Sequence, residues 1–256
     1  MNSTFSFYYK APAEIIAESL ALFARMTVQP NTAQKLIIND TIKALKNAGI
    51  WDLLDVFVLL HSHNTQSTYL NWKANQSNGT PTNSPVFTAF EGTTTASGKY
   101  ISTNFIPNAN TKYQLNNAMY GIYTNSLTGP TASVCMHSVG NNSLVSRMYR
   151  KNSASKFQGT INTASVAGNV LLSTAITEFT GLHAMQIDAS VGKLFKNGQK
   201  QAEQAYAPSG TSNSQFIVGY SDYVTYQSYV IGAALTDQQH ADLNNIINAY
   251  LTNYKP

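Results

Sequence analysis

An Asn-Gly pair at positions 197 and 198 is the feature that most constrains the fold. A tight type I′ turn needs positive φ at both central residues, and Asn followed by Gly meets this need best. The pair lies inside the segment 191–202. The sequence therefore predicts a β-hairpin here, with one strand on each side of the pair.

The residues after this hairpin predict two more strands and a helix. Segments 216–220 and 226–232 are rich in aromatic and β-branched residues, which strands prefer. Thr236 and Gln239 have the spacing of a capping box, which marks a helix start. The helix must bury its apolar side, most simply against the preceding sandwich. That side is formed by Leu243, Ile246, Ile247, Tyr250 and Leu251.

The middle of the chain predicts many short strands. Residues 56–60 form a continuous apolar run, which is typical of a strand buried on both faces. Short strands separated by turn signals indicate an antiparallel sandwich or barrel. The further candidate strands are 86–90, 98–103, 117–123, 133–138, 143–149, 156–160, 170–177 and 182–187.

The first fifty residues predict two helices. Pro12 suits the first turn of one, whose apolar face is formed by Ile16, Leu20 and Phe23. The second is capped by Asn31 or Thr32 and ends at Gly49. Two such helices cannot bury their apolar faces alone, so they need the sandwich or a partner chain. We assign residues 1–50 to a helical attachment segment and 51–256 to a sandwich domain. Within the former, residues 2–10 predict a short strand or an arm that packs on a neighbour.

Charge patterning favours neither nucleic acid nor membrane. Charged residues make up 11% of the chain, so a net charge of +4 is only a mild bias. The polar positions are uncharged, which suits glycan contact, extracellular exposure or neighbouring subunits, but also an ordinary neutral surface. One basic cluster, Arg147, Arg150, Lys151 and Lys156, could bind a polyanion or form a solvated loop. The single cysteine, Cys135, lies in an apolar run and is expected to be buried. We expect no signal peptide and no membrane insertion.

Three segments near the end of the chain carry a resemblance to a known superfamily. They are Lys-Leu-Phe-Lys-Asn-Gly-Gln at 193–199, Phe-Ile-Val-Gly-Tyr at 216–220, and Gly-Ala-Ala-Leu-Thr-Asp-Gln-Gln-His-Ala-Asp-Leu at 232–243. In this order they resemble the end of the concanavalin A-like, or laminin-G-like, jelly-roll superfamily. The resemblance implies a mainly β fold: an antiparallel jelly-roll sandwich with an N-terminal helical segment and a short C-terminal helix.

The front half extends the resemblance. Segments 22–30, 42–55, 70–73 and 84–105 look like a segment that precedes such a jelly roll in virion proteins of tailed bacteriophages. This implies a tail- or capsid-associated particle component. The matching motifs carry no chemistry, so no functional residue is transferred.

The carboxylates do not form the pattern of a glycosidase. Hydrolases of this superfamily carry a short Glu-x-Asp-x-Glu run, and retention needs two carboxyls about 5 Å apart. Here the only close glutamates are Glu14 and Glu18, on a predicted helix surface. Glu178 and Asp188 could meet in space, but the sequence does not bring them together. We therefore expect no enzyme.

Cofactor and metal patterns are equally weak. His61 and His63 share one face of a possible strand, yet no Cys, Asp or Glu follows at close spacing, so structural histidines are the better interpretation. Asp222 with Asn213 is the nearest approach to a calcium loop, and it is poor. No Ser-His-Asp arrangement can be argued, and no phosphate-binding glycine loop is present. We expect no cofactor.

The tyrosines near the end of the chain form the one constellation typical of binding. Tyrosine rings stack on sugar faces and sit well in interfaces. We predict Tyr220, Tyr223 and Tyr226 as ligand-binding residues; Tyr229 belongs to the same group. The alternative is that these rings belong to the core or to a sheet surface.

Together these observations predict a structural component of a phage virion, assembled in the host cytoplasm. Its partners would be other virion proteins and further copies of itself, since phage appendages are symmetric. Its jelly roll would contact host-surface glycans or neighbouring subunits. The alternatives are a carbohydrate-binding module without a structural role and a glycoside hydrolase that uses Glu178 or Asp188.

Overall fold

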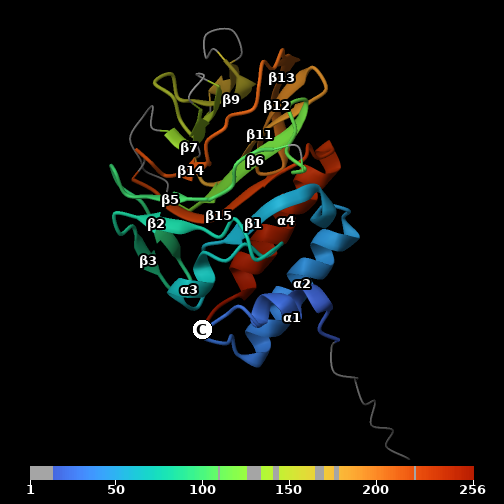
Figure 1. Ribbon diagram of the computed structural model, residues 1–256, viewed down its shortest axis with the longest axis vertical. Coiled ribbons are helices and arrows are strands. Elements are labelled where there is room, and N and C mark those ends of the chain that lie inside the picture. Colours follow the sequence, from blue (N-terminus) through green and yellow to red (C-terminus); the bar gives the residue numbers. More distant parts are fainter. Residues whose placement is uncertain are drawn as a thin grey trace, which may run out of the picture.

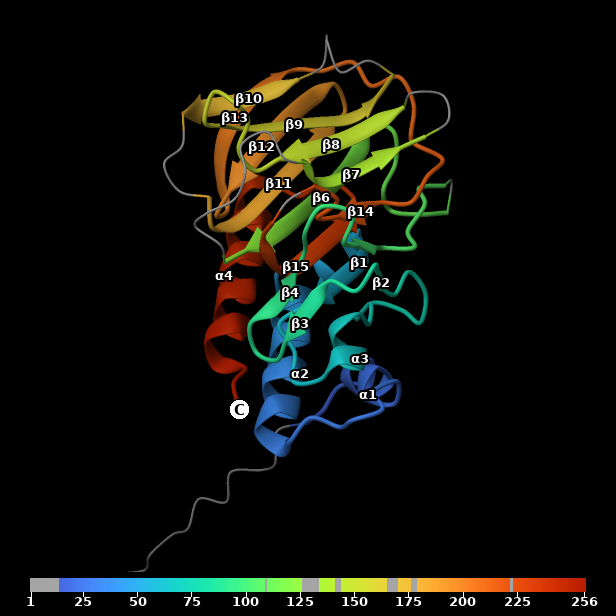
Figure 2. The same ribbon diagram turned by 90° about the vertical axis from the view of Figure 1, so that its left-hand side faces the viewer.

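The computed structural model describes residues 14–108, 110–125, 134–140, 144–164, 170–175, 179–221 and 223–256. They form three layers: a layer of helices, a first sheet, and a second sheet packed on its far side (Figures 1 and 2). All strand pairs are antiparallel. The expected antiparallel sandwich is confirmed.

The first sheet, sheet A, is the middle layer. Its strands run in the order β13-β12-β11-β6-β15-β4-β3, and β1 pairs with β15 beside β4. The bounds are β1 Leu54–Leu59, β3 Val86–Thr88, β4 Gly92–Thr94, β6 Asn117–Thr124, β11 Gly181–Asp188, β12 Val191–Lys196, β13 Gln199–Ala205 and β15 Thr225–Gly232.

The second sheet, sheet B, has one face on sheet A. Its strands run in the order β10-β9-β8-β7-β14-β5-β2. Segment 216–220 was predicted as a strand, but only its two central residues pair. The bounds are β2 Thr80–Thr82, β5 Tyr100–Ser102, β7 Val134–Val139, β8 Val145–Tyr149, β9 Lys156–Thr163, β10 Leu171–Ala175 and β14 Ile217–Val218.

The main core lies between the two sheets, where each strand contributes alternate side chains. Large rings fill it, and several carry their hydroxyls to buried partners. The Tyr120 hydroxyl donates to the Thr160 carbonyl at 2.6 Å, and the Tyr206 hydroxyl accepts from the Ile161 N–H at 2.8 Å. Cys135 is buried in this core, as predicted.

The helices cover the outer face of sheet A and form a second core with it. They are α1 Ala17–Phe23, α2 Thr32–Asn47 and α4 Asp237–Asn253. Two shorter helices, η1 Trp51–Leu53 and α3 Thr65–Thr68, come before and after β1 in the chain. Both predicted caps are present: Asn31 with Gln34 on α2, and Thr236 with Gln239 on α4. Strand β1 therefore has helices on one face and sheet B on the other, which confirms its predicted double burial. No helix in the described part of the chain is long and apolar enough to cross a membrane.

The first helix differs from its prediction. It begins at Ala17, and Pro12 lies outside the described residues. Leu20, expected on the apolar face, is 56% exposed, whereas Leu22 is fully buried. Ile16 and Phe23, the other two expected positions, do pack in the core between the helices and sheet A, so the prediction is wrong at one position.

The helices pack on the sandwich as part of the same unit. Ile50 and Trp51 are both buried in the core between the helices and sheet A. Packing is therefore continuous across residue 50, where we placed the domain boundary. We expected either the sandwich or a partner chain to bury the apolar faces of the helices, and in this structure the sandwich buries them.

The Asn197-Gly198 hairpin forms as predicted and also fixes the last helix. Asn197 has φ 51° and Gly198 has φ 77°. A Cβ on Gly198 would lie 2.6 Å from Cα of Ala241 in α4. Only glycine allows this turn and this close approach together. The turn thereby sets where α4 crosses sheet A.

Candidate functional site

The outer face of sheet B points away from sheet A (Figure 2), and its side chains range from buried, as for Ser102 and Thr160, to half-buried, as for His137 and Arg147. Strand pairing places Ser102, Ile217, His137, Arg147 and Thr160 side by side in one row across it. Their sequence neighbours point the other way, into the core between the sheets. This row joins residues that are more than a hundred positions apart in the chain.

Tyr220 projects onto this face from the turn after β14. Gly219 has φ 81°, donates its N–H to the Cys135 carbonyl at 2.8 Å, and leaves no room for a Cβ, which would lie 2.4 Å from the Thr95 side chain. The Tyr220 ring lies against Tyr100 and against His137, with both centroid distances 5.5 Å. Its exposed fraction is 48%. One side of the ring is thus held by two other rings while the side chain stays open to solvent.

His137 also lines a cleft of about 420 Å³. Its apolar part includes Ile106 and Val139, which are 47% and 41% exposed. Its polar part comes from the segment before β14, which is held by a 2.6 Å hydrogen bond from Ser138 Oγ to the Ser214 carbonyl. The lining residues are Ile106, His137, Val139, Asn213, Ser214, Gln215 and Ile217. We call this cleft, with Tyr100 and Tyr220, the Tyr220 site.

His137 is the one titratable residue among the described residues that line the cleft. Burial, helped by the positive Arg147, lowers the pKa of His137 to about 4, so its imidazole is uncharged at neutral pH. Its Nδ1 atom is buried without a hydrogen-bond partner in the described residues. Arg147 donates to the Tyr149 hydroxyl at 3.3 Å. The site can therefore offer stacking surface, amides and a neutral imidazole to a ligand.

The three predicted tyrosines have different environments. Tyr220 and Tyr223 are exposed, at 48% and 57%. Tyr226 has no exposed surface and packs in the core between the sheets, so it offers no ring to a ligand and is not part of the site. Tyr229 is buried there too. The two buried residues belong to β15, an interior strand of sheet A, whereas the two exposed ones precede it.

The cleft residues that sequence reasoning missed came from three separate places. Ile106 follows β5, Val139 ends β7, and Asn213 to Gln215 precede β14. The one signal that could have pointed to a cleft residue was an exposed apolar residue at the end of a strand. Nothing local in the sequence says that these ends meet.

The residues that could have supported catalysis or metal binding lie elsewhere. Within the described part of the chain, no carboxylate lines the cleft. Asp188 lines another pocket together with Lys193 and Asp237, and Glu178 and Asp222 lie outside the described residues. Among the residues that the structure describes, no group of three or more His, Cys, Asp or Glu could hold a metal ion.

The His61 and His63 pair is structural, in line with the preferred interpretation. His61 Nε2 contacts the Tyr254 carbonyl at 2.8 Å, and His63 Nδ1 contacts the Tyr254 hydroxyl at 2.6 Å. The Tyr250 hydroxyl donates to the His61 carbonyl at 2.9 Å. The two imidazoles thus fasten the end of α4 to the segment after β1.

The basic cluster does not form one solvated loop. Arg150 is buried, donates to the Phe179 carbonyl at 3.2 Å and lies over the Phe179 ring. Lys151 lies over the same ring, while Arg147 belongs to the sheet face described above. Arg150 and Lys151 thus share the Phe179 ring as a partner within the chain.

Comparisons with solved structures find the same fold at low identity. The binding domain of botulinum neurotoxin serotype D matches with a TM-score of 0.53 and 14% identity, over 78% of this chain and 52% of that one. A sialidase of Trypanosoma rangeli matches with a TM-score of 0.51 and 10% identity, over 82% of this chain and 38% of that one. The receptor-binding domain of botulinum neurotoxin type G has a TM-score of 0.50 and 10% identity, over 75% and 51%.

These three matches span about half or less of the other protein's length. No family model and no curated protein sequence matches the chain. At such identities the likeness shows the fold alone. The chain is thus a mainly β protein built as an antiparallel two-sheet sandwich, with helices over the outer face of one sheet.

Proposed function

We propose that this chain is a glycan-binding module and that the Tyr220 site is where the glycan binds. The observation that carries the proposal is the half-exposed Tyr220 ring, which contacts Tyr100 and also His137, a residue that lines the neighbouring cleft. A sugar presents apolar C–H faces, which pack on tyrosine, and hydroxyls, which pair with amides and imidazole. Asn213 and Gln215 supply such amides, and Ile106 and Val139 supply apolar surface.

The similar structures support a binding role. Two of them are a binding domain and a receptor-binding domain of neurotoxins. The low charge of the chain fits the same proposal, because a neutral glycan needs hydrogen bonds and stacking rather than ion pairs. Binding without cleavage is proposed as well, since none of the described residues that line the cleft is a carboxylate able to act as acid or nucleophile.

The test is a broad glycan array, followed by titration of the best ligand against the full chain and its variants. We expect Tyr220→Ala to raise Kd by about tenfold or more, which corresponds to about 1.4 kcal/mol. Leu172→Ala is the matched control. Leu172 is 44% exposed on β10, at the far edge of the same sheet, and its loss should leave Kd unchanged.

Two outcomes would contradict the proposal. One is that the parent chain binds no glycan above background; the other is that Leu172→Ala weakens binding as much as Tyr220→Ala does. The bound oligosaccharide should also be recovered uncut after long incubation. Shortened products would instead favour a hydrolase.

We also propose a setting for this module, a tailed-phage virion in which several copies assemble. One observation favours such a two-sided role. The Tyr220 site lies on the outer face of sheet B, and the helices lie on the opposite side of the molecule, over sheet A. A particle could hold the helix side while the site faces outward.

Gold-labelled antibody against the chain, applied to purified particles, tests this setting. We expect label at one fixed position on heads or tails. Intact particles without label, and free protein in the supernatant, would remove the virion proposal and leave the glycan-binding proposal standing.

A further inference from the structure

A second cleft meets the Tyr220 site at Ile106. It has a volume of about 430 Å³, and its lining includes Asp55, Gln76 and Asn104. We call it the Asp55 cleft. Ile106, which is 47% exposed, lines both this cleft and the cleft of the Tyr220 site, so the two meet at one exposed apolar side chain. Each volume falls within the range of about 300–1,000 Å³ that small-molecule sites occupy.

The Asp55 carboxylate is held in place by backbone groups. Strand β1 has a bulge at this position, where its register against β15 shifts by one residue, and a bulge re-aims the side chain of its extra residue. Asp55 Oδ1 accepts from the Lys112 N–H and Oδ2 accepts from the Tyr113 N–H, both at 2.8 Å. Each carboxylate oxygen keeps a second lone pair for the hydroxyl of a ligand.

Two amide side chains add further hydrogen-bonding groups. Asn104 uses both N–H bonds of its amide within the chain, on the Asn78 carbonyl and the Thr80 hydroxyl, both at 2.8 Å, so its Oδ1 atom is left as an acceptor. Gln76 is exposed; its backbone carbonyl accepts from Asn71 Nδ2 at 3.0 Å, and its side-chain amide makes no hydrogen bond to any residue that the structure describes. The described lining includes neither a cation nor a second carboxylate, so it can bind hydroxyls but lacks the pair of carboxyls that hydrolysis needs.

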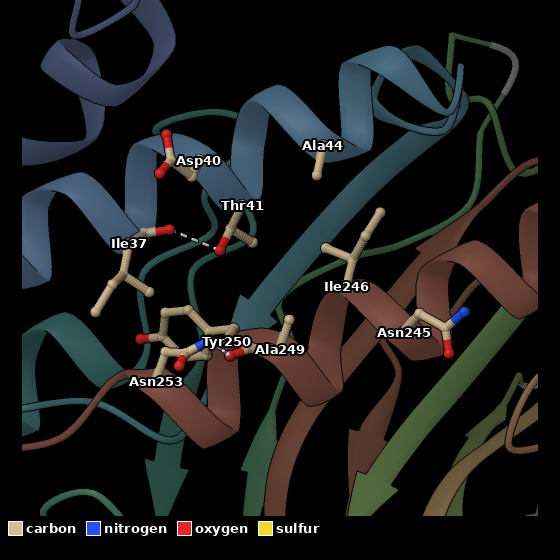
Figure 3. Close-up of a pocket in the computed structure, with 9 residues that line it drawn as sticks. All are labelled: Ile37, Asp40, Thr41, Ala44, Asn245, Ile246, Ala249, Tyr250 and Asn253. Atoms are coloured by element: carbon tan, nitrogen blue, oxygen red, sulfur yellow. Dashed lines mark hydrogen bonds between the residues drawn. The ribbon is translucent and has the colours of Figure 1, made fainter. Parts of the chain in front are cut away.

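A groove between α2 and α4 has a similar volume, about 420 Å³, but a different lining (Figure 3). Most of its lining residues are apolar. The Thr41 hydroxyl donates to the Ile37 carbonyl within α2, and Asn253 donates to the Ala249 carbonyl within α4, both at 2.8 Å. This α2–α4 groove shares no lining residue with the Tyr220 site, so it provides a control for the test below.

We propose that the Tyr220 site and the Asp55 cleft bind consecutive units of one oligosaccharide, which crosses Ile106 between them. The inference rests on the proposed glycan-binding function and names its ligand class: a chain of two or more sugar units, with a neutral unit in the Asp55 cleft. The hydroxyls of that unit donate to Asp55 and Asn104, and its C–H surface packs on Ile106. An acidic unit there would set its charge against the Asp55 carboxylate, and no cation of the described lining would pair with it.

The test is calorimetric titration of the full chain with the neutral oligosaccharide that binds best on the glycan array, and with its fragments shortened one unit at a time. We expect the shortest fragment that still binds to have a Kd about tenfold or more above that of the whole ligand. Gln76→Ala should raise the Kd of the whole ligand by about three- to tenfold, the effect of one lost hydrogen bond, and leave that of the shortest fragment unchanged. Tyr220→Ala should weaken both. Gln76 is chosen because its side chain, unlike that of Asp55, holds no backbone of the described chain.

Asn245→Ala is the matched control, because Asn245 is an exposed amide that lines the α2–α4 groove (Figure 3), and its loss should leave both Kd values unchanged. A parent chain that binds no glycan would end the proposed function and this inference together. Binding that Tyr220→Ala weakens, but that neither Gln76→Ala nor the length of the ligand changes, would overturn this inference alone. So would tighter binding of the corresponding uronic acid oligosaccharide, since every unit of it carries a carboxylate.

Discussion

Acidification from pH 7.5 to pH 5 is expected to lower the free energy of unfolding by about 4 kcal/mol, through His183 and His240 alone. Both imidazoles are fully buried, that of His183 on β11 and that of His240 on α4. Burial, aided for His183 by Lys196 and Arg150, lowers the pKa of each to about 3. His183 packs edge-on against Phe157, and His240 stacks on Phe195 with its Nε2 2.7 Å from Gln186 Oε1.

The sign follows from counting protons. The unfolded chain protonates each imidazole as the pH falls through about 6.5, whereas the folded chain holds both neutral until about pH 3. Between these values the unfolded state binds more protons, so stability falls with falling pH. Each histidine contributes about 2 kcal/mol at pH 5, and His137, whose pKa is lowered to about 4, acts in the same direction.

Urea unfolding of the full chain at pH 7.5, 6 and 5 measures this loss. A variant with His183→Gln is expected to start from a lower stability but to lose about 2 kcal/mol less over the same range. His240→Gln should behave likewise. A pH dependence that neither replacement reduces would place its origin in other groups.

Replacing Tyr226 with alanine is expected to destabilise the chain by about 3–5 kcal/mol, the usual cost of removing a buried aromatic ring. Tyr226 has no exposed surface and lies in the core, beside strands β4 and β6 on either edge of β15. Its removal would leave a cavity that the two sheets cannot close. The midpoint of urea or thermal unfolding gives the loss.

The matched comparison is Tyr220→Ala, six positions earlier. Tyr220 is half exposed, so its replacement should change stability by no more than about 1 kcal/mol while it removes ring surface from the Tyr220 site. The difference in stability loss between the two variants distinguishes a tyrosine of the core from a tyrosine of the binding site. Similar stability losses in both would contradict the burial described above.

Local signals in the sequence predicted the local structure well. The Asn197-Gly198 turn, the Asn31 and Thr236 caps and the positive φ of Gly49 all form as expected. Each depends on a few adjacent residues, whose backbone preferences act over one turn. The prediction for α1 was wrong at Leu20, because a helix of two turns has too few apolar positions to decide between neighbouring residues.

The candidate site could be predicted only in part, because strand pairing over long distances creates it. Tyr220 meets Tyr100 and His137 because Ile217 and Val218 pair with both β5 and β7. The same aromatic pattern continues into β15, where Tyr226 turns into the core. Side chains alternate along a strand, so neighbouring residues point to opposite faces of the sheet. The alternation does not tell which of the two faces another layer buries.

The position of β15 has a consequence for how the chain acquires its structure. This strand pairs with β1, β4 and β6, yet it follows all of them by more than a hundred residues in the sequence. A growing chain could make α1, α2 and β1 long before the strand that completes their sheet exists. Proteins whose pairings span such distances fold slowly, because loop closure precedes the contacts that stabilise it. During synthesis the apolar faces of α1 and α2 would stay exposed until β15 has been made. Exposed apolar surface of this kind is what chaperones bind.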